Sequence, residues 1–414
     1  MKIALVFYNL SMPAGGQRQF LSLAQMLKTK GHRVVVFSVN IDKNIYPDLW
    51  RGIDVRVLDG SSRNKLVTKG NVPDFFWGKV VGFFASWRNY NNLAFSMSEM
   101  MDNDFDVVNC HEDFAYKVGL FYKEKNKKAR VIWTLNNVPY FYAPEKNFLK
   151  NVKKFIFVKL QDLILEKKYF KAVDRVCVLS KYEERWAKER NLNVQVIRSG
   201  LDFDFFYSLV KKFVGEKQTV KLLSIGILGR HRRFEDTLLA TKILKEKGFD
   251  VKTSIICKEI DKISEEDYKN YLLKFVEENS LYDCVNFNFD GVSESVLPKV
   301  YSQNDIFVHP VFIPPPQYYG WGLAVFEAIA AGLPVVLCNV TGATEVLEDG
   351  KTALFAKPLS GKSFADKIEL LIKTPTLYKK IASDAQVWVK ENISWMKYAD
   401  NMEELFLELK NIHG

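Results

Sequence analysis

Cysteines are few in this chain and widely scattered. The five cysteines, which include Cys110, Cys257 and Cys338, form no Cys-x-x-Cys pair and no spacing typical of metal ligands. An odd, dispersed set of thiols argues against a disulfide framework and favours a reducing compartment. We therefore expect no metal site and no disulfide-stapled secreted domain.

Long apolar runs are also missing. No window approaches the roughly 18 uncharged apolar residues that a membrane-spanning helix needs, and the apolar run near Met1 is too short for a signal peptide. We expect a cytoplasmic protein that can work at the inner face of the membrane. Its formal charge of +10 favours anionic partners such as nucleotides, phosphosugars or acidic lipids. The basic residues are dispersed without a recognition motif, so nucleic-acid binding is the weakest alternative.

Two α/β patterns follow one another along the 414 residues. The first runs from a strand at 3–8 through a glycine loop and a helix at 17–30 to a strand at 33–39, and the second begins with a strand at 220–225 and a helix at 235–247. This order is the opening of a parallel, doubly wound sheet. Further strands are expected at 106–110, 130–134, 175–179, 193–197, 251–256, 285–289, 306–308 and 334–337, and helices at 363–373 and 386–409.

The predicted fold is thus α/β, with two Rossmann-like doubly wound domains facing each other across a cleft. We assign residues 1–200 to an acceptor-side domain and 201–385 to a donor domain, and expect a helix at 386–414 to pack back on the first. Sheets of this class bind ligands beyond the carboxyl ends of their strands. Two such domains suit a reaction between two substrates from which water is excluded.

Two loops between a strand and a helix are candidate phosphate sites. Gly15 and Gly16 permit close approach to the backbone where a helix begins, although the pattern is no Gly-x-Gly-x-x-Gly fingerprint and a tight turn without a ligand is the alternative. Arg230, Arg232 and Arg233 follow the strand at 220–225. Guanidinium groups clamp phosphate oxygens, so these arginines suggest a diphosphate site, and the alternative is a solvated charged turn.

Three other polar residues have a structural and a functional interpretation. His111 follows a strand and could contact a sugar or could be a structural histidine. Glu327 lies after the glycine loop Tyr319–Gly322, at the start of a helix over 328–331. Its carboxylate could cap the helix or accept two hydrogen bonds from a ribose diol. Glu345 has the same ambiguity.

Two stretches mix basic and aromatic residues. In 74–90 several large aromatic residues, including Phe83 and Trp87, recur at helical spacing, and 150–171 contains seven lysines among apolar residues. A cationic amphipathic surface of this kind can lie on an anionic membrane. The alternative for each is a core helix with a solvated basic face.

Several of these segments resemble those of the retaining glycosyltransferases of family 4, which have the GT-B fold and use sugar nucleotides. The similar segments are spread over nearly the whole chain, and the most specific is Trp321–Val336. The others are Gly15-Gly16 with Gly31–Val36, Asp106–His111, Asp174–Ser180, Val196–Asp202, Gly291–Ser293, Thr341–Glu345, Glu348–Gly350 and Ser394-Trp395.

The resemblance implies roles for individual residues. Glu327 matches the second Glu of the family's Glu-x7-Glu motif and would bind the donor ribose; Arg232 matches a diphosphate-binding lysine; and His111 would contact the transferred sugar. No metal or other cofactor is expected. The donor would be held by Arg230, Arg233, Tyr319, Gly320, Trp321, Gly322, Leu323, Gly291 and Glu345, and Gly15 and Gly16 would form an acceptor or phosphate loop.

Three positions depart from the family pattern. Tyr319 replaces the first Glu of the motif, Ile227 replaces a phosphate-binding arginine for which Arg230 or Arg233 could compensate, and Cys257–Glu259 replace a glycine-rich turn. The main hypothesis is transfer of a hexose-type sugar from a nucleoside diphosphate to a saccharide or lipid-linked acceptor in cell-envelope glycan synthesis. The alternatives are a non-catalytic nucleotide-sugar-binding protein and a sugar-nucleotide epimerase on the same fold.

Overall fold

The computed structural model describes residues 1–12, 14–58, 76–112, 115–136, 167–259, 262–313 and 320–412, without the side chains of 76–87, 217 and 262–265. The chain forms two compact units. Unit 1 comprises Met1–Ser199 and Trp395–Gly414, and unit 2 comprises Gly200–Ser394. Among the helices within the described ranges, none has the length and apolar character needed to span a membrane.

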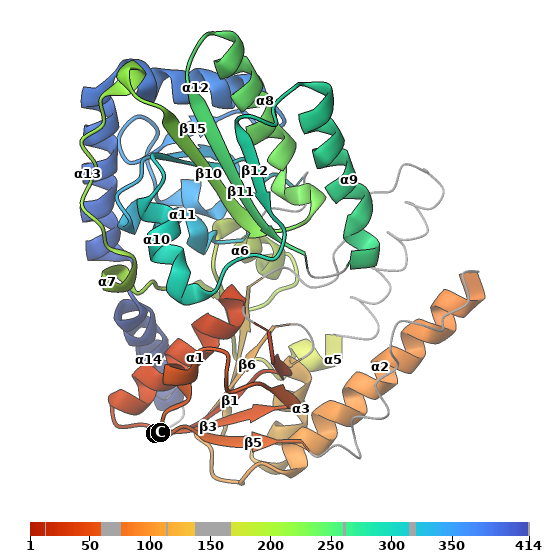
Figure 1. The fold of residues 1–414 in the computed structure, drawn as a ribbon. Helices are drawn as coiled ribbons and strands as arrows, with labels where there is room; N and C mark the ends of the chain where they lie inside the picture. Colours follow the sequence, from red (N-terminus) through yellow and green to blue (C-terminus); the bar gives the residue numbers. More distant parts are fainter. Residues whose placement is uncertain are drawn as a thin grey trace. The chain divides into compact units, whose positions relative to one another are not determined.

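Unit 1 is built on a parallel sheet of seven strands in the order β5-β3-β1-β6-β7-β8-β9 (Figure 1). Short runs of β-branched and aromatic residues, buried on both faces, form its central strands. The strand order reverses between β1 and β6, where Val6 pairs with Cys110. The strands are β1 (Lys2–Val6), β3 (Arg33–Ser38), β5 (Asp54–Val57), β6 (Val107–His111), β7 (Arg130–Leu135), β8 (Arg175–Val178) and β9 (Val194–Val196), beside a small pair, β2 (Asn9–Leu10) and β4 (Asn40–Ile41).

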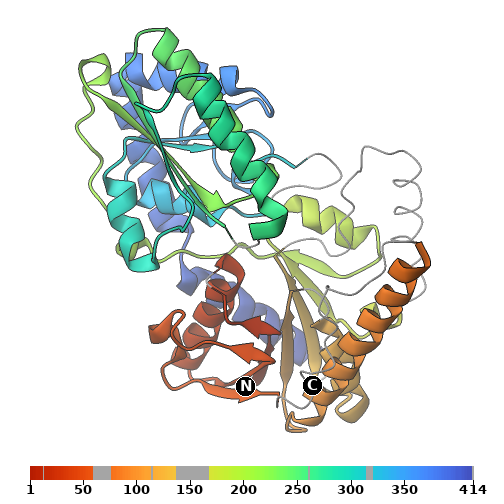
Figure 2. The same cartoon turned by 45° about the vertical axis from the view of Figure 1, so that its right-hand side comes forward.

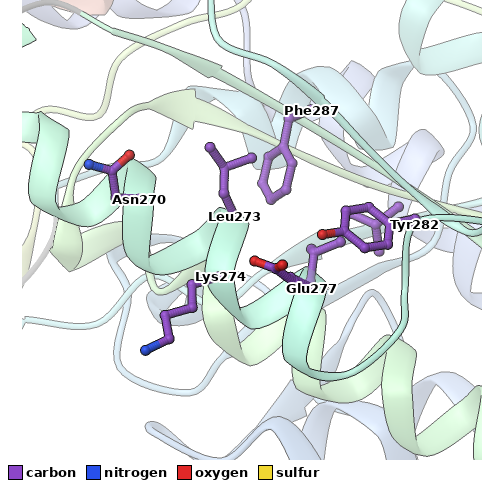
Figure 3. A pocket seen from close by; sticks show the side chains of 8 residues that line it. Asn270, Leu273, Lys274, Glu277, Tyr282 and Phe287 are labelled. Atoms are coloured by element: carbon purple, nitrogen blue, oxygen red, sulfur yellow. The ribbon is translucent and has the colours of Figure 1, made fainter.

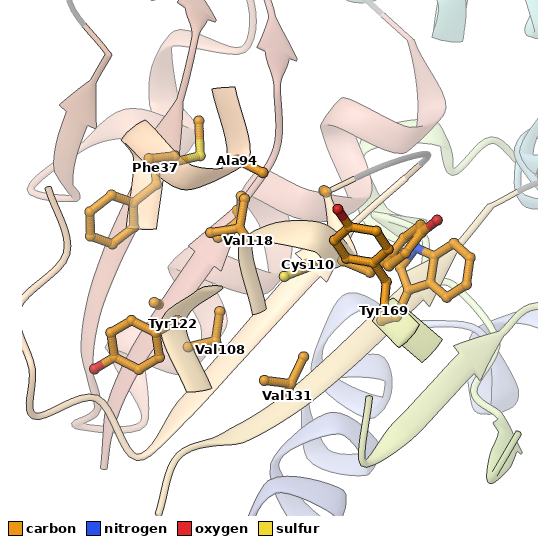
Figure 4. Packing of buried hydrophobic residues seen from close by; sticks show 14 of the residues in the cluster. Phe37, Ala94, Val108, Cys110, Val118, Tyr122, Val131 and Tyr169 are labelled. Carbon is orange, nitrogen blue, oxygen red and sulfur yellow. The ribbon is translucent and has the colours of Figure 1, made fainter. Parts of the chain in front are cut away.

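Helices cover both faces of this sheet. On one face, the side chains of alternate strand residues such as Val108 and Val131 pack against Ala94, Val118 and Tyr122 of the helices (Figure 4). On the other face, α1 carries Phe20 and packs against α14 at the end of the chain, as Figure 1 and Figure 2 show. The helices of unit 1 are α1 (Gly15–Thr29), α2 (Phe76–Glu99), α3 (Tyr116–Lys125), α5 (Lys167–Phe170), α6 (Lys181–Lys188), α14 (Trp395–Asn411) and the 3-10 turn η1 (Pro47–Trp50).

Unit 2 repeats the architecture with a parallel sheet of six strands in the order β12-β11-β10-β13-β14-β15. The order reverses between β10 and β13, where Leu223 pairs with Phe307. The predicted α/β fold with two doubly wound sheets is therefore confirmed. The strands are β10 (Val220–Ile227), β11 (Val251–Lys258), β12 (Val285–Asn288), β13 (Ile306–His309), β14 (Val335–Cys338) and β15 (Leu354–Ala356).

The two faces of the second sheet are also covered. Ile306 and Val308 point to the face covered by α8 and α12, which pack against each other, whereas Phe307 points to Tyr301 on the opposite face. The helices of unit 2 are α7 (Phe203–Phe206), α8 (Phe234–Glu246), α9 (Lys262–Glu278), α10 (Leu297–Ser302), α11 (Leu323–Ala330), α12 (Gly361–Lys373) and α13 (Pro375–Asn392), with 3-10 turns η5 (Gly215–Lys217), η6 (Arg230–Arg232), η7 (Glu294–Val296) and η8 (Gly342–Glu345).

The end of the chain differs from the sequence-based expectation. Instead of one helix over 386–409, α13 begins at Pro375 and ends at Asn392, and α14 begins at Trp395. The chain leaves the helix at Ile393, whose backbone is extended and whose side chain is buried. This break divides the segment between the two units, so α13 belongs to unit 2 and α14 to unit 1.

Candidate functional site

The reversals of strand order bring the predicted site residues together within each unit. In unit 1, β1 leads to Gly15 and Gly16, which form the first turn of α1, and the neighbouring β6 ends at His111. In unit 2, β10 leads to the arginines of η6, and the neighbouring β13 ends at His309. Ligands of doubly wound sheets bind at such reversals, outside the carboxyl ends of the strands.

His111 is completely buried in unit 1. Its ring meets the ring of Phe20 on α1 edge-on, with centroids 4.8 Å apart, and stacks at 6.4 Å on Phe7. Burial lowers the pKa of the imidazole to about 3, so the ring is neutral at physiological pH. Within the described parts of the chain, neither ring nitrogen has a hydrogen-bond partner.

Two polar side chains beside His111 were not predicted as site residues. Glu112 and Asn136 each follow directly after a strand, β6 and β7 respectively. A Cβ atom added to Gly16 would lie 2.8 Å from Glu112 Oε1 and 2.8 Å from Asn136 Nδ2. Both side chains therefore lie over the first turn of α1, and a larger residue at Gly16 would require them to move. The signal that could have found them is a polar residue immediately beyond the carboxyl end of a buried strand.

The three predicted arginines of unit 2 have different surroundings. Arg232 lies over Gly226, because a Cβ there would come 3.0 Å from its Nε. Arg230 is exposed and lies over the ring of Tyr268, 5.4 Å from its centroid. Arg233 has a left-handed backbone (φ 54°), and its guanidinium pairs with Glu235 at 2.6 Å and with Asp236 at 3.0 Å. Arg233 is thus engaged by its own helix, and Arg230 is the better substitute for the missing arginine at Ile227.

Two neutral imidazoles flank Arg232. Burial and the guanidinium of Arg232 lower the pKa of His231 to about 4. Burial, Arg232 and His231 lower the pKa of His309 to about 3. His309 was not predicted, although its position at the end of β13 is the same kind of signal as that of His111. Its Nε2 lies 3.7 Å from the place of a Cβ on Gly322, so His309 lies close both to Arg232 and to the glycine loop before α11.

The prediction that Glu327 begins a helix is wrong. The helix α11 begins four residues earlier, at Leu323, because Gly322 takes a left-handed backbone (φ 79°) that starts the helical turn there. Glu327 lies in the second turn, so the alternative in which its carboxylate caps the helix is excluded. The side chain is buried, and the hydroxyl of Tyr301 on α10 donates a hydrogen bond to Oε2 at 2.9 Å. Nothing in the local sequence marks Tyr301 as its partner.

The glycine loop before α11 packs closely against η8. A Cβ on Gly342 would lie 3.1 Å from the carbonyl oxygen of Gly320 and 3.2 Å from Cα of Trp321. The buried ring of Trp321 stacks on Phe326 of α11, with centroids 4.5 Å apart. Glu345 ends η8, so its half-buried side chain belongs to the element that touches this loop.

The remaining predicted residues are more scattered. Gly291 has a left-handed backbone (φ 72°) and follows β12, where a Cβ would lie 3.0 Å from Cβ of Lys258. Tyr319 lies outside the described residues. Among those that are described, no group of three His, Cys, Asp or Glu side chains is arranged to hold a metal ion.

A pocket of about 540 Å³ lies elsewhere on unit 2 (Figure 3). It is bounded by Leu273 and Glu277 of α9 and by Tyr282 and Phe287 at β12, and no predicted site residue lines it. Tyr282 precedes the amino end of β12, opposite to the strand ends at which such sheets bind ligands. We therefore do not assign the catalytic chemistry to this pocket.

Two family models match the chain over most of its length. The model described as Glycosyltransferase Family 4 matches residues 13–205, and the model described as Glycosyl transferases group 1 matches residues 209–388. The chain belongs to glycosyltransferase family 4. This family 4 enzyme is a retaining glycosyltransferase with the GT-B fold that uses a nucleotide sugar.

Relatives of the enzyme span most of its length. An uncharacterized glycosyltransferase, MJ1069, of Methanocaldococcus jannaschii is 26% identical over 336 residues, which cover 78% of this chain and 79% of that protein. The capsular polysaccharide biosynthesis glycosyltransferase CapM of Staphylococcus aureus is 25% identical over 274 residues, 62% of this chain and 66% of that protein. The structure of Anabaena Alr3699/HepE with UDP and glucose is 17% identical, covers 99% of this chain and 100% of that chain, and superposes with a TM-score of 0.70.

Proposed function

We propose that this family 4 enzyme transfers a hexose-type sugar from a nucleoside diphosphate to a saccharide or lipid-linked acceptor in cell-envelope glycan synthesis. The similarity to a capsular polysaccharide glycosyltransferase supports the envelope assignment. UDP-glucose is the first donor to test, because the Anabaena neighbour has been crystallised with UDP and glucose.

Unit 2 binds the donor in this proposal. The buried carboxylate of Glu327, held by Tyr301, accepts hydrogen bonds from the two ribose hydroxyls. The guanidinium of Arg232, assisted by Arg230, binds the diphosphate above Gly226. The backbone from Gly320 to Leu323 holds phosphate or sugar oxygens beside it.

In the same proposal, His111 of unit 1 contacts the transferred sugar as a neutral hydrogen-bonding group. The bond between the anomeric carbon and the diphosphate oxygen breaks, and the acceptor oxygen bonds to the same face of the sugar. The acceptor proton passes to the leaving diphosphate, whose charge Arg232 stabilises. Such fixed electrostatic stabilisation is usually the largest contribution to catalysis.

The observation that supports the proposal most directly is the position of Arg232 over Gly226, at the strand reversal and beside His309. The test is a thermal-shift screen with UDP, GDP, ADP and their common sugar conjugates, because a ligand of the folded state raises the melting temperature by mass action. One nucleotide should shift the wild type, and Glu327→Ala and Arg232→Ala should abolish the shift and the transfer.

Matched controls for this test are Glu278→Ala and Arg51→Ala, which remove exposed side chains of the same types away from the proposed site. Full transfer by Glu327→Ala and Arg232→Ala would refute the site assignment. A nucleotide shift without turnover over a broad panel would favour the non-catalytic binding protein, and conversion of the donor without an acceptor would favour the epimerase.

Contact with an anionic membrane is a further part of the proposal. It rests on the aromatic and basic composition of 74–90, where the structure describes the helix α2 from Phe76 but no side chain before 88. The stretch 150–171 lies mostly outside the described residues. We expect the protein to sediment with anionic liposomes, and the double variant Phe83→Ser, Trp87→Ser to lose this binding. Equal sedimentation of the wild type and the double variant would argue against a membrane-binding surface in residues 74–90.

A further inference from the structure

The pocket on unit 2 is formed by one stripe of a helix and by an edge of the sheet. Asn270, Leu273, Lys274 and Glu277 line it from α9. Their spacing of three and four residues places them on one face of that helix. Figure 3 shows these side chains along α9, with Phe287 of the edge strand β12 beside them. Leu273 is 42% exposed, so the pocket opens to the surface of the protein.

The turn between α9 and β12 holds Tyr282 at the rim of this pocket. Ser280 has a left-handed backbone (φ 49°), and its N–H donates to the carbonyl oxygen of Glu277 at 3.1 Å. The N–H of Leu281 donates to the carbonyl oxygen of Val276 at 3.0 Å. These two bonds form the Schellman motif that ends many helices. Because the motif buries Leu281, the next side chain, Tyr282, points outward and is 68% exposed.

The lining combines apolar walls with hydrogen-bonding groups. Leu273 and Phe287 form the apolar part, and the ring of Phe287 stacks on Phe289 with centroids 5.1 Å apart. Tyr282 adds a second aromatic ring, and Figure 3 shows its hydroxyl on the side of the Glu277 carboxylate. Pockets of this composition bind molecules that present both an apolar face and polar groups.

The charges at the pocket disfavour an anionic ligand. The ammonium group of Lys274 is already paired with the carboxylate of Glu278, with Nζ 3.5 Å from Oε1. Within the described parts of the chain, Glu277 takes part in no salt bridge. Its carboxylate is therefore available to accept hydrogen bonds from hydroxyl groups, whereas the charge of a phosphate would be repelled.

We infer that this pocket binds a neutral oligosaccharide at a site remote from the carboxyl ends of the strands. The C–H faces of the hexose rings lie on Phe287 and Tyr282. Their hydroxyls donate to the carboxylate of Glu277 and accept from the amide of Asn270. The volume of about 540 Å³ is within the range of small-molecule sites.

The source of the ligand rests on the proposed function, because an enzyme of glycan synthesis works beside its own elongated saccharide. A second point of attachment on unit 2 keeps this glycan on the enzyme between transfers. Tethering of this kind raises the effective concentration of the acceptor without any new contact at the reacting atoms.

The experiment uses the full-length protein with a fluorescent label at the pocket. All five native cysteines are buried, so the exposed thiol introduced by Lys274→Cys reacts selectively with the label. The same label on Lys379→Cys of α13, an exposed position that does not line the pocket, is the control reporter. The probes are neutral oligosaccharides of glucose, galactose and mannose, with UDP and inorganic phosphate as anionic comparisons and hexanol as an apolar one.

Two matched pairs of variants are made in the reporter protein. Tyr282→Ser removes the ring at the rim, and Tyr271→Ser removes another exposed tyrosine of α9 that does not line the pocket. Glu277→Gln removes the unpaired carboxylate, and Glu278→Gln removes its neighbour outside the pocket. Because all four side chains are exposed, the variants should fold like the wild type.

At least one oligosaccharide should change the signal of the label on Lys274→Cys and leave that on Lys379→Cys unchanged, and UDP, phosphate and hexanol should change neither. Tyr282→Ser should weaken oligosaccharide binding about tenfold or more, because a stacking face is lost. Glu277→Gln should weaken it about fivefold, because a neutral acceptor replaces a charged one. Tyr271→Ser and Glu278→Gln should bind as the reporter protein does.

The inference is overturned if no oligosaccharide changes the label, if UDP, phosphate or hexanol changes it as strongly, or if the control variants lose as much affinity. It is also overturned if light scattering shows a dimer whose dissociation alone moves the label, because the pocket is then a contact between copies. The nucleotide thermal shifts test the proposed function separately. If no nucleotide shifts the wild type while oligosaccharides still change the label, the donor assignment fails and the saccharide site stands.

Discussion

At the scale of single residues, the pair Tyr301 and Glu327 links the fold to the proposed chemistry. The two are joined by one hydrogen bond of 2.9 Å in a buried setting. A hydrogen bond to a charged group contributes roughly 1.5–3 kcal/mol. Its loss would leave the carboxylate in place but remove one contact that orients it toward a ribose.

We expect Tyr301→Phe to weaken donor binding by about tenfold or more while transfer remains detectable, because the carboxylate is still present but misoriented. Titration of the donor nucleotide by calorimetry measures the change. Tyr398→Phe is the matched control, since it removes a buried hydroxyl that contacts Gln19 of unit 1 at 3.0 Å. Equal donor affinity in Tyr301→Phe and the wild type would mean that Glu327 does not need this partner.

A second prediction at this scale concerns acid stability. The pKa of His111 is about 3 in the folded protein against an ordinary value of 6.5. Between these values the unfolded chain binds a proton that the folded chain excludes, so stability is full above pH 6.5 and falls as the pH is lowered toward 3. At a pH of about 5 the loss from one such histidine is about 2 kcal/mol.

Replacing His111 by Gln should therefore make unit 1 less sensitive to acid. Melting curves at a pH of about 7.5 and about 5 should show a smaller difference for His111→Gln than for the wild type. His32→Gln is the control, because this histidine pairs with Glu403 at 2.6 Å near the surface. If the melting temperature of His111→Gln changed with pH as much as that of the wild type, the conclusion that His111 is buried in its neutral form would be wrong.

At the scale of elements, the start of α11 depends on one glycine. Gly322 has a φ of 79° and places its missing Cβ beside His309. A side chain there costs about 1–2 kcal/mol in backbone strain. It would also move the turn that presents the loop from Gly320 to Leu323.

We expect Gly322→Ala to lose donor binding as well as stability. Gly350→Ala provides the comparison, because Gly350 has a φ of 77° and nothing within 4 Å of its missing Cβ. Both variants should lose similar stability in thermal melts, and only Gly322→Ala should lose the nucleotide-induced shift. If both variants kept that shift, the glycine loop would have no part in holding the donor.

At the scale of the whole molecule, the chain returns to unit 1 after completing unit 2. The last helix, α14, is held there by polar contacts of Glu403 with Lys30 and His32. Its apolar face is buried over seven side chains: Trp395, Tyr398, Ala399, Met402, Leu405, Phe406 and Leu409. Each large apolar side chain contributes about 1.5–3 kcal/mol on burial, before the entropy cost of ordering the helix is subtracted. Because a whole domain is stable by only about 5–15 kcal/mol, the loss of these contacts is large enough to unfold unit 1.

A chain that ends at Ser394 should therefore fail to fold unit 1 while unit 2 persists. Limited proteolysis should leave a protected fragment that begins near Gly200. Glu403→Gln, which removes only the charge, should lower stability by about 1 kcal/mol and leave both units protected. Equal protection of unit 1 with and without residues 395–414 would show that α14 is dispensable.

The sequence by itself determined the fold class and most strands of both sheets, because hydrophobic periodicity and the glycine loops are local signals. It also predicted His111 and Arg232 as site residues from their places near strand ends: His111 ends β6, and Arg232 lies in the turn η6 after β10. These two roles stay predictions. Only the tertiary structure decided where α11 begins, because the backbone of Gly322 depends on its surroundings. The contacts of Tyr301 with Glu327 and of Glu112 with Gly16 likewise arise only from the packing of separate elements. Contacts between segments that are distant in the sequence leave no local pattern from which they could be predicted.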